Sequence, residues 1–426
     1  MKILVIGSGG REHAILWSLQ ITATDQLELF CAPGNAGIAQ IAKRVQIKAD
    51  EIEALAAFAA ASGIDLTIVG PEAPLAAGIV DTFEQRGLRI VGPRRAAAQL
   101  ESSKAFAKDF MRRHRIPTAR YRIASSADEA IQILQSGEFG DKDATVVVKA
   151  DGLAAGKGVI VASSRMHALE AVSHLASGAV DPAAVDRIVI EEALCGREVS
   201  LLLFSDGQDF RLMPAARDHK RIGENDTGPN TGGMGSITGN GILDATQREK
   251  IVRDIVEPTL YGARAEGFAF RGILFIGLML TATGPRVLEY NVRFGDPETQ
   301  AILVRLRSSL VDVFEAIAEQ KLGKIQLEWS SGSSACVVLA AAGYPGKPQT
   351  GARIEGLDVV PGQNEVAIFH AATERGGQGE WLTAGGRVLG VTSAASNLEL
   401  ALSNCYRVIG NIVWPGMQYR RDIGRS

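Results

Sequence analysis

Short apolar segments alternate with helical segments through the first hundred residues of the chain. The apolar segments have the length and β-branched content of buried strands, whereas the intervening segments have the spacing of helices. The pattern predicts strands at 2–6, 27–31, 66–69 and 89–91, and helices at 11–19, 51–62 and 74–85. Strands separated by helices form right-handed βαβ units, so we expect a parallel sheet covered by helices.

Each of these predicted strands ends in a turn rich in Gly or Pro. The turns lie at 7–10, 32–37, 70–72 and 92–93. The carboxyl ends of parallel strands meet at one edge of a sheet, where α/β proteins bind their ligands. The turns therefore predict a crevice that admits a ligand close to the backbone.

The pattern changes after residue 100 and again after residue 324. We expect a basic helix over 101–117, then short strands at 145–149, 159–162 and 187–191 with a helix near 166–176. Longer strands at 199–204, 273–280 and 286–291 and a helix at 245–264 should follow. After residue 324 we expect antiparallel strands at 333–342, 365–371, 381–383 and 387–392, and a helix at 398–409. These elements predict an α/β protein with a parallel α/β domain over 1–102, a central α+β domain over 103–326 with a small lid at about 123–192, and a mostly β domain over 327–426.

Composition excludes several classes of partner. The 426 residues include 45 Lys and Arg against 48 Asp and Glu, a net charge of −3 that produces no field for nucleic acid or an anionic membrane. The longest apolar run, 273–280, is far shorter than the ~20 residues of a bilayer helix. The four cysteines are widely spaced, which is typical of reduced thiols. We expect a cytoplasmic monomer that acts on small molecules, with no nucleic-acid or membrane partner.

The segment 287–298 carries the most informative chemistry. Read as a strand, it places Glu289, Asn291 and Arg293 on one face, and Tyr290 and Val292 on the other. A carboxylate and an amide oxygen are hard ligands suited to Mg²⁺, which fills its other positions with water and phosphate oxygens. The arginine adds a planar fork for a carboxylate or phosphate. The alternative is a polar edge strand with a surface ion pair, which is the better interpretation only if the chain has no nucleotide site.

Two glycine-rich loops have the composition of phosphate-binding segments. The loop at 7–10 joins a strand to a helix, but Glu12 replaces the third glycine of the dinucleotide fingerprint, which disfavours NAD. The segment 148–159 contains Lys149, Lys157 and three glycines, and it fits a hairpin that closes over a triphosphate better than a P-loop. A tight βα turn and a surface hairpin are the respective structural alternatives.

Two further segments have weaker signals. An apolar strand ends at Glu191, and a turn then leads to Glu198, an arrangement that offers backbone groups to an adenine edge and a carboxylate to a ribose. The polar residues 218–221 precede a loop at 226–235 with four glycines. This composition is unsuited to a hydrophobic core but suits a substrate-binding loop. Acidic turns and isolated histidines such as His219 more often have structural roles.

These segments, in this order, resemble the ATP-grasp ligases. The resemblance rests on a lysine at 104, the hairpin at 149–158, the connector at 191–198 and the Glu289/Asn291 strand. Within that superfamily the blocks 7–13, 33–37, 218–221, 228–235 and 293–300 are similar to glycinamide ribonucleotide synthetases, also called phosphoribosylamine–glycine ligases. The similarity extends through essentially the whole chain.

The resemblance implies an ATP-grasp enzyme with a Rossmann-like domain before the ATP-grasp domain. It implies that glycine attacks the γ-phosphate of ATP to form glycyl phosphate, and that the amine of 5-phosphoribosylamine then forms the amide, releasing ADP and phosphate in purine biosynthesis. It implies Mg²⁺ or Mn²⁺ at Glu289 and Asn291; nucleotide contacts from Lys104, Lys149, Gly156, Glu191, Leu194 and Glu198; substrate contacts from Gly9, Gly10, Pro33, Asn35, Asp218 and Lys220; and catalytic roles for Arg293, Lys157 and Asp218.

The sequence departs from the family pattern at a few positions. Arg217 replaces a usual Gln, residues 236–239 replace a more usual Ala-Tyr-Ser-Pro run, and Ala301 replaces a Pro. The strand at 273–280 also lacks the acid that many ATP-grasp enzymes use as a metal ligand. Another ATP-grasp ligase or a carboxylase of purine metabolism is the alternative function, followed by a non-catalytic nucleotide-binding regulator.

Overall fold

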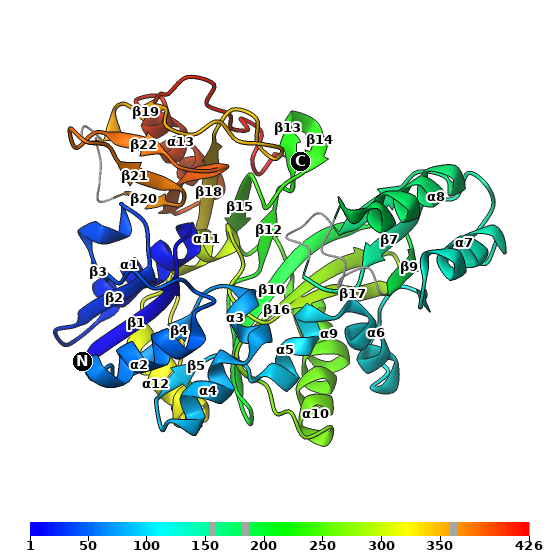
Figure 1. The fold of residues 1–426 in the computed structure, drawn as a ribbon, viewed down its shortest axis with the longest axis horizontal. Coiled ribbons are helices and arrows are strands. Elements are labelled where there is room, and N and C mark those ends of the chain that lie inside the picture. Colours follow the sequence, from blue (N-terminus) through cyan, green and yellow to red (C-terminus); the bar gives the residue numbers. More distant parts are fainter. Residues whose placement is uncertain (154–157, 180–186, 358–364, 426) are drawn as a thin grey trace.

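A five-stranded parallel sheet forms the N-terminal part of the chain (Figure 1). A computed structural model describes residues 1–153, 158–179, 187–357 and 365–425. The sheet has the order β3-β2-β1-β4-β5, built from β1 (Lys2–Gly7), β2 (Glu28–Pro33), β3 (Lys43–Arg44), β4 (Leu66–Val69) and β5 (Ile90–Val91), with helices α1 (Gly10–Thr22) and α2 (Ile52–Ser62). The predicted parallel sheet is confirmed. The pattern missed β3, because this strand has two exposed basic residues and no apolar signal.

Two predicted helices are each divided in the structure. The segment expected as one helix at 74–85 is α3 (Glu72–Ala77) and α4 (Ile79–Gln85), because Gly78 adopts a left-handed φ of 92° between them. The segment expected at 101–117 contains the end of α5 (Arg95–Ser102) and all of α6 (Lys104–Arg113). Ser103 starts the second helix by accepting a hydrogen bond from the amide of Phe106.

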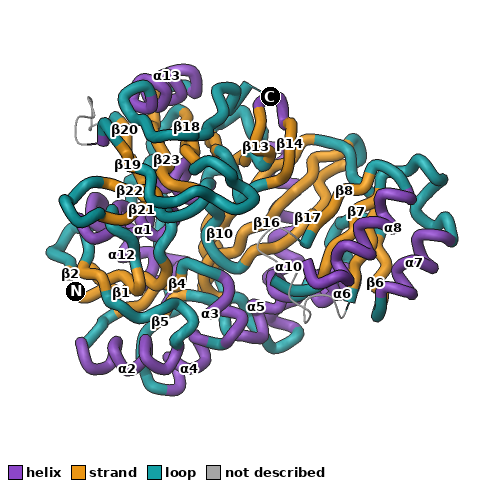
Figure 2. Tube along the Cα trace, turned by 45° about the horizontal axis from the view of Figure 1, so that its top comes forward, coloured by secondary structure: helices purple, strands orange, loops and turns teal. Residues whose placement is uncertain are grey.

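The region expected to form a lid is a four-stranded antiparallel sheet with its own apolar core. Its order is β6-β9-β7-β8, built from β6 (Tyr121–Ala124), β9 (Ile188–Glu192), β7 (Val146–Ala150) and β8 (Val159–Ala162). Helices α7 (Ala127–Gln135) and α8 (Arg165–His174) cover one face, at the end of the molecule away from the N-terminal sheet (Figures 1 and 2). The sequence pattern predicted β7, β8, β9 and α8, but it missed β6 and α7.

A nine-stranded antiparallel sheet runs from the centre of the molecule into the C-terminal segment. Its path is β17 (Gly284–Asn291), β16 (Arg271–Thr281), β10 (Arg197–Asp206), β12 (Ala216–Asp218), β15 (Gly235–Thr238), β18 (Ser333–Ala340), β23 (Arg387–Ala395) and β20 (Val366–His370), with β11 (Phe210–Leu212) paired to β10. The strand pairing from β15 to β18 joins the central and C-terminal parts through continuous backbone hydrogen bonds.

The remaining elements complete the layers around this sheet. They are the hairpin β13 (Arg221–Gly223) and β14 (Thr227–Asn230), helices α9 (Ala245–Ile251), α10 (Glu257–Ala265), α11 (Glu298–Leu303), α12 (Leu310–Ala318) and α13 (Leu398–Ile409), and a small sheet of β19 (Arg353–Ile354), β22 (Trp381–Thr383) and β21 (Thr373–Arg375). The expected helix at 245–264 is α9 and α10 joined by one wider π turn. The largest apolar cluster includes residues from the N-terminal, central and C-terminal parts, so these parts share one core.

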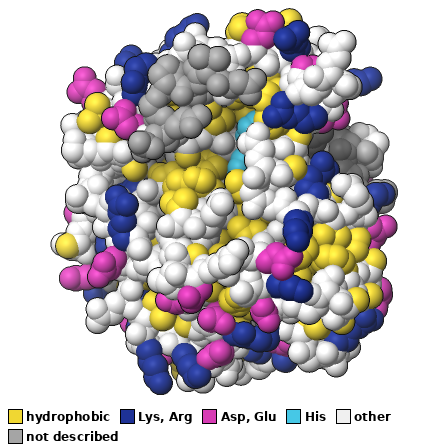
Figure 3. Space-filling model, turned by 90° about the vertical axis from the view of Figure 1, so that its left-hand side faces the viewer, with side chains coloured by type: hydrophobic (Ala, Val, Ile, Leu, Met, Phe, Trp, Pro, Cys, Tyr) yellow, Lys and Arg dark blue, Asp and Glu magenta, His cyan; other side chains and the backbone are white. Residues whose placement is uncertain are grey.

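The surface carries mixed charge, as the composition predicts. Figure 3 shows one face, on which basic and acidic side chains are interspersed rather than gathered by sign. In the part of the chain that the structure describes, no helix is long and apolar enough to cross a membrane.

Candidate active site

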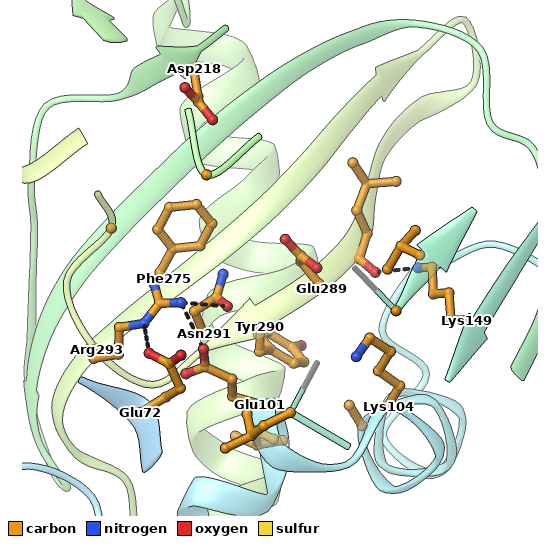
Figure 4. A pocket seen from close by; sticks show the side chains of 18 of the residues that line it. Glu72, Glu101, Lys104, Lys149, Asp218, Phe275, Glu289, Tyr290, Asn291 and Arg293 are labelled. Atoms are coloured by element: carbon orange, nitrogen blue, oxygen red, sulfur yellow. Dashed lines mark hydrogen bonds and ion pairs between the residues drawn. The ribbon is translucent and has the colours of Figure 1, made fainter. Parts of the chain in front are cut away.

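A cavity of about 470 Å³ lies where the lid, the central sheet and helices α5 and α6 meet (Figure 4). We call it the first cavity. Its charged lining residues are Arg11, Glu72, Glu101, Lys104, Lys108, Lys149, Glu191, Asp218, Lys220, Glu289, Arg293, Asp296, Glu298 and Arg387. These side chains come from segments far apart in the sequence, so the tertiary fold alone brings them together.

The carboxylate of Glu289 points into the first cavity from β17 (Figure 4). Tyr290 also borders the cavity, and its hydroxyl forms a 2.7 Å hydrogen bond with Thr259. A register shift between Val287 and Glu289 interrupts the regular alternation expected for this strand. Within the described residues, the Glu289 carboxylate has no hydrogen bond or ion pair. Burial acts to raise the pKa of Glu289, but the charges of Lys220 and neighbouring lysines outweigh it and hold the pKa below its ordinary value. Glu289 is therefore an ionised oxygen donor that is free to bind a ligand.

Asn291 and Glu289 together fit a divalent cation that takes few protein ligands. The Asn291 side chain lines the same cavity, and its Oδ1 accepts a 3.3 Å hydrogen bond from Arg293. No group of three or more His, Cys, Asp or Glu suited to a metal occurs among the residues that the structure describes. One carboxylate and one amide oxygen match Mg²⁺ or Mn²⁺ that completes its coordination with water and phosphate, rather than zinc.

Arg293 is held by two carboxylates from the N-terminal helices. Its Nε lies 3.1 Å from Glu72 at the start of α3, and its Nη2 lies 2.8 Å from Glu101 in α5. Burial acts to lower the pKa of Arg293, but these two negative charges raise it overall. Burial also raises the pKa of Glu101 to about 7, against the opposing effect of Arg293. The guanidinium is thus fixed in orientation and permanently charged.

Lysines occupy the lid side of the first cavity. Lys149 and Lys108 each lie 2.8 Å from one oxygen of the buried Glu191, and Lys104 donates a 3.0 Å hydrogen bond to the carbonyl of Gly152. Burial acts to raise the pKa of Glu191, but the two lysines lower it overall, so the carboxylate stays ionised. These side chains concentrate positive charge opposite Glu289, where a polyphosphate requires it.

Asp218 and Lys220 line the side of the first cavity nearest the hairpin β13–β14. Lys220 forms an ion pair with Glu198. The carboxylate of Asp218 lies near Glu298. Burial and the negative charge of Glu298 raise the pKa of Asp218 well above its ordinary value. Burial likewise raises the pKa of Glu298, whose Oε1 accepts a 3.1 Å hydrogen bond from Ser200. This pair of carboxyl groups therefore tends to retain a proton.

A second cavity, of about 750 Å³, lies between the N-terminal loops and the C-terminal segment. Its polar and glycine lining residues are Ser8, Gly9, Gly34, Asn35, Arg44, Asp296, Thr373, Glu374, Arg375, Gly386 and Arg387. Of the four turns predicted to form a crevice, those at 7–10 and 32–37 border this cavity, and the C-terminal segment supplies its opposite wall. The turn at 70–72 reaches the first cavity through Glu72, and the turn at 92–93 lines neither cavity. Three arginines on the lining of the second cavity suit an anionic ligand such as a phosphate monoester.

Comparisons with known proteins agree along the whole chain. Residues 1–101, 102–299 and 334–426 match the N domain, the ATP-grasp (A) domain and the C domain of phosphoribosylglycinamide synthetase. The chain belongs to the phosphoribosylglycinamide synthetase family. This confirms the resemblance seen in the sequence.

Individual relatives have similar length throughout. Phosphoribosylamine–glycine ligase of Xanthomonas axonopodis pv. citri is 47% identical, covering 100% of this chain and 97% of the relative, and that of Vibrio cholerae is 45% identical, covering 100% and 98%. The crystal structure of phosphoribosylamine–glycine ligase from Thermotoga maritima has a TM-score of 0.84 at 33% identity, covering 99% and 100%. The biotin carboxylase domain of Hydrogenobacter thermophilus 2-oxoglutarate carboxylase has a TM-score of 0.74 at 16% identity, covering 98% and 91%, which shows a shared fold.

The structure of this family member brings together most of the predicted site residues. The first cavity is lined by Lys104, Lys149, Glu191, Asp218, Lys220, Glu289, Asn291 and Arg293, and the second by Gly9 and Asn35. Glu198 reaches the first cavity indirectly, through its ion pair with Lys220. Leu194 lies in the turn between β9 and β10, outside the described lining of either cavity. Gly156 and Lys157 lie outside the described residues.

The loops predicted to bind the sugar phosphate have specific packing. Asn35 donates 2.8 Å hydrogen bonds to the carbonyls of Ser8 and His370 and accepts one from the amide of Ile38, so its side chain joins an N-terminal loop to the C-terminal segment. Pro33 ends β2 beside this loop. Gly10 starts α1, where a Cβ atom would lie 2.9 Å from Nε2 of Gln300. The turns therefore shape the cavity largely through backbone.

Sequence reasoning missed several charged residues of the site. Lys108 follows Lys104 by four positions, a spacing that places both on one face of a helix, so the basic helix contained a usable signal. Glu72, Glu101 and Arg387 had no such signal, because their partners lie more than 90 positions away.

Two departures from the phosphoribosylglycinamide synthetase pattern lie opposite one another. Arg217 in β12 is paired with Ile237 in β15, within the altered segment 236–239. Ala301, the third departure, is fully buried in α11. The two altered strands are neighbours in the central sheet, so the substitutions at 217 and 236–239 change one local surface.

Proposed function

We propose that this protein ligates glycine to 5-phosphoribosylamine with ATP, giving glycinamide ribonucleotide, ADP and phosphate in purine biosynthesis. The observation that carries the proposal is the pair of adjoining cavities. One combines lysines with the free carboxylate of Glu289, as a nucleotide site requires, and the other has arginines and glycine turns, as a sugar phosphate requires. The relatives that match the whole chain have this activity in their names.

The nucleotide belongs in the first cavity. Lys104 and Lys149 would neutralise its phosphates, and Glu191, Leu194 and Glu198 would contact adenosine. Gly156 and Lys157, which lie outside the described residues, would also bind the phosphates. Glu289 and Asn291 would hold Mg²⁺ or Mn²⁺ among these phosphates. When bound, the ion supplies charge neutralisation and orients the phosphate chain.

The residues around the transferring phosphoryl group contribute position and charge. Arg293 is fixed by Glu72 and Glu101, so its guanidinium is pre-oriented toward the phosphoryl oxygens. Phosphoryl transfer to the carboxylate of glycine requires little covalent chemistry from the protein, because positioning and electrostatic stabilisation supply most of the rate. The lid then has a purpose, since it keeps water from the acyl phosphate.

5-Phosphoribosylamine belongs in the second cavity with its amine directed toward the first. Gly9, Gly10, Pro33 and Asn35 would shape its site, and Arg44 and Arg375 are the lining cations available for its phosphate. Asp218 and Lys220 would contact the substrates from the side of the first cavity, with Asp218 near the reacting groups.

The proposal extends to organisation and setting. We place domain boundaries at 1–102, 103–326 and 327–426, with the lid at about 123–192, and we expect the protein to act as a cytoplasmic monomer. The described structure is consistent with reduced thiols, since all four cysteines are free.

An assay of ADP release tests the function directly. ADP should form only when ATP, glycine, 5-phosphoribosylamine and Mg²⁺ are all present, and omission of either acceptor substrate should reduce the rate to background. Bicarbonate in place of glycine separates the ligase from a carboxylase. ADP formation with bicarbonate, or none with glycine, would contradict the proposal.

A further inference from the structure

Two residues form a common wall between the first and second cavities. Asp296 and Arg387 line both cavities, and no other described residue does so. Nη2 of the arginine lies 3.0 Å from Oδ2 of the aspartate. This ion pair therefore lies at the boundary between the two cavities.

The pair is held in place by a dense set of hydrogen bonds. Arg387, the first residue of β23, donates to the carbonyls of Gly232 at 2.6 Å and Asp296 at 2.7 Å. Oδ1 of Asp296 accepts a 2.7 Å hydrogen bond from Gln300 in α11. A Cβ atom on Gly232 would lie 3.1 Å from Cζ of Arg387, so glycine gives the guanidinium room.

The carboxylate of Asp296 is accessible to ligands despite these contacts. The Asp296 and Arg387 side chains retain 18% and 22% exposure. A Cβ atom on Gly9 would lie 3.7 Å from Oδ2 of Asp296, so this oxygen faces the glycine turn of the second cavity. Arg293, in the first cavity, precedes Asp296 by only three residues. The aspartate thus lies between the proposed sites of the two reacting substrates.

We infer that Asp296 is a catalytic residue of the amide-forming step and that Arg387 is its positioning residue. This inference depends on the proposed function. Oδ2 of Asp296 accepts a hydrogen bond from the amine of 5-phosphoribosylamine and aims its lone pair at the carbonyl carbon of glycyl phosphate. Arg387 fixes the carboxylate, so the C-terminal segment completes the active site.

The step requires no further reactant. The amine nitrogen forms a bond to the carbonyl carbon, and the bond between that carbon and the phosphate oxygen breaks. Phosphate departs with the electron pair and takes up the proton that the nitrogen loses. Asp296 orients the amine throughout and ends the step in its initial protonation state.

The Asp296→Asn variant gives the sharpest test. The asparagine retains an oxygen for Gln300 but presents an NH₂ group both to the amine and to Nη2 of Arg387, so both hydrogen bonds of Oδ2 are lost with little change in side-chain volume. With all substrates present, we expect more ADP than glycinamide ribonucleotide, because glycyl phosphate forms but is hydrolysed. The KM for 5-phosphoribosylamine should rise at least about ten-fold, as expected for one lost hydrogen bond to a charged group, with the KM for ATP within about two-fold of wild type.

Arg387→Gln should likewise form more ADP than glycinamide ribonucleotide. In Arg387→Lys the ratio of ADP to product should return part of the way to one, because the charge is retained. Thermal unfolding verifies that each variant folds. Arg407→Gln is the matched control, because it removes a 2.9 Å ion pair with Glu365 in the same C-terminal segment, away from both cavities.

The outcomes separate the inference from the proposed function. If the wild-type protein forms no glycinamide ribonucleotide, the proposed function fails. If the wild type is active and folded Asp296→Asn keeps one ADP per product with an unchanged KM for 5-phosphoribosylamine, the inference is wrong. Equal loss of ADP and product in that variant also contradicts it, because the residue would then act before amide formation.

Discussion

Glu101 binds both the side chain of Arg293 and the backbone of the strand that precedes it. One carboxylate oxygen lies 2.8 Å from the guanidinium, and the other accepts a 2.7 Å hydrogen bond from the amide of Val292. A helix of the N-terminal region thereby fixes the end of the segment that carries Glu289 and Asn291. The same carboxylate thus holds the arginine and the backbone directly after Asn291.

Replacing this carboxylate should affect catalysis more than binding. In Glu101→Gln the amide can still accept the hydrogen bond from Val292, but the ionic contact with Arg293 is lost. A charge-assisted hydrogen bond contributes about 1.5–3 kcal/mol, so we expect kcat to fall by about 10- to 100-fold. Steady-state kinetics should show a much smaller change in the KM for ATP.

A matched variant in the same region is Glu53→Gln. Glu53 also forms an ion pair with an arginine, Arg86, but its side chain is 73% exposed. Its kinetics should equal those of wild type. Equal kcat values for Glu101→Gln and wild type would show that Arg293 needs no support from the N-terminal helices.

Removal of the free carboxylate at 289 should abolish ligation without affecting the fold. Glu289 has no hydrogen bond or ion pair within the described residues, so Glu289→Ala removes no polar contact of the folded protein there. We expect ligation to fall by at least about 100-fold, or ~2.7 kcal/mol of activation free energy, with an unchanged melting temperature. Titration with Mn²⁺ in the presence of ATP should show weaker metal binding.

The exposed Glu249 on α9 is a suitable control for this change, since Glu249→Ala removes a carboxylate outside both cavities. Normal activity in folded Glu289→Ala would refute the assignment of the metal ligand.

The buried ion pair between Lys108 and Glu191 should contribute to stability. Both side chains are 2% exposed and 2.8 Å apart. Lys108→Met leaves Glu191 with Lys149 as its one remaining partner in the described structure, and breaking a buried pair costs about 3 kcal/mol. Urea denaturation should show this loss in the free energy of unfolding.

The double variant Lys108→Met/Glu191→Gln should recover part of that free energy, because the unpaired charge is removed as well. Lys43→Met is the control, since the ion pair of Lys43 with Glu28 is exposed and should contribute little to the free energy of unfolding. A loss no greater in Lys108→Met than in Lys43→Met would contradict this prediction.

Asp422 should make the stability of the protein depend on pH in the acid range. It forms two 2.8 Å contacts with the buried Arg420, which also binds Asp226 beside the hairpin β13–β14. The hydrogen bonds from Arg420 lower the pKa of Asp422 to about 2. Because the folded-state pKa is lowered, the stabilisation is complete above the ordinary pKa near 4 and is lost as the pH falls through 2.

The free energy of unfolding of Asp422→Asn should therefore be lower than that of wild type at pH 7, and the difference should shrink below pH 4. Urea denaturation at several pH values measures this. A difference that is constant from pH 7 to pH 2 would show that the charge of Asp422 has no part in the effect.

Local patterns of the sequence were sufficient for most elements and for one part of the site. The two-residue repeat of a strand predicted that Glu289, Asn291 and Arg293 share one face, and all three line the first cavity, although β17 ends at Asn291. Glycine and proline turns at the ends of parallel strands likewise predicted a crevice. These inferences succeeded because they depend on backbone geometry within a few residues.

The tertiary structure decided which groups meet. The sequence alone indicated that Arg293 suits an anion, but only the fold shows that Glu72 and Glu101 hold it. Three further contacts could not be predicted from the sequence: the hydrogen bonds by which Asn35 joins two loops, the ion pair of Lys220 with Glu198, and the wall formed by Asp296 and Arg387. The physical reason is that a strand or turn is determined by its neighbours in the chain, whereas a salt bridge in a cavity depends on how distant elements pack.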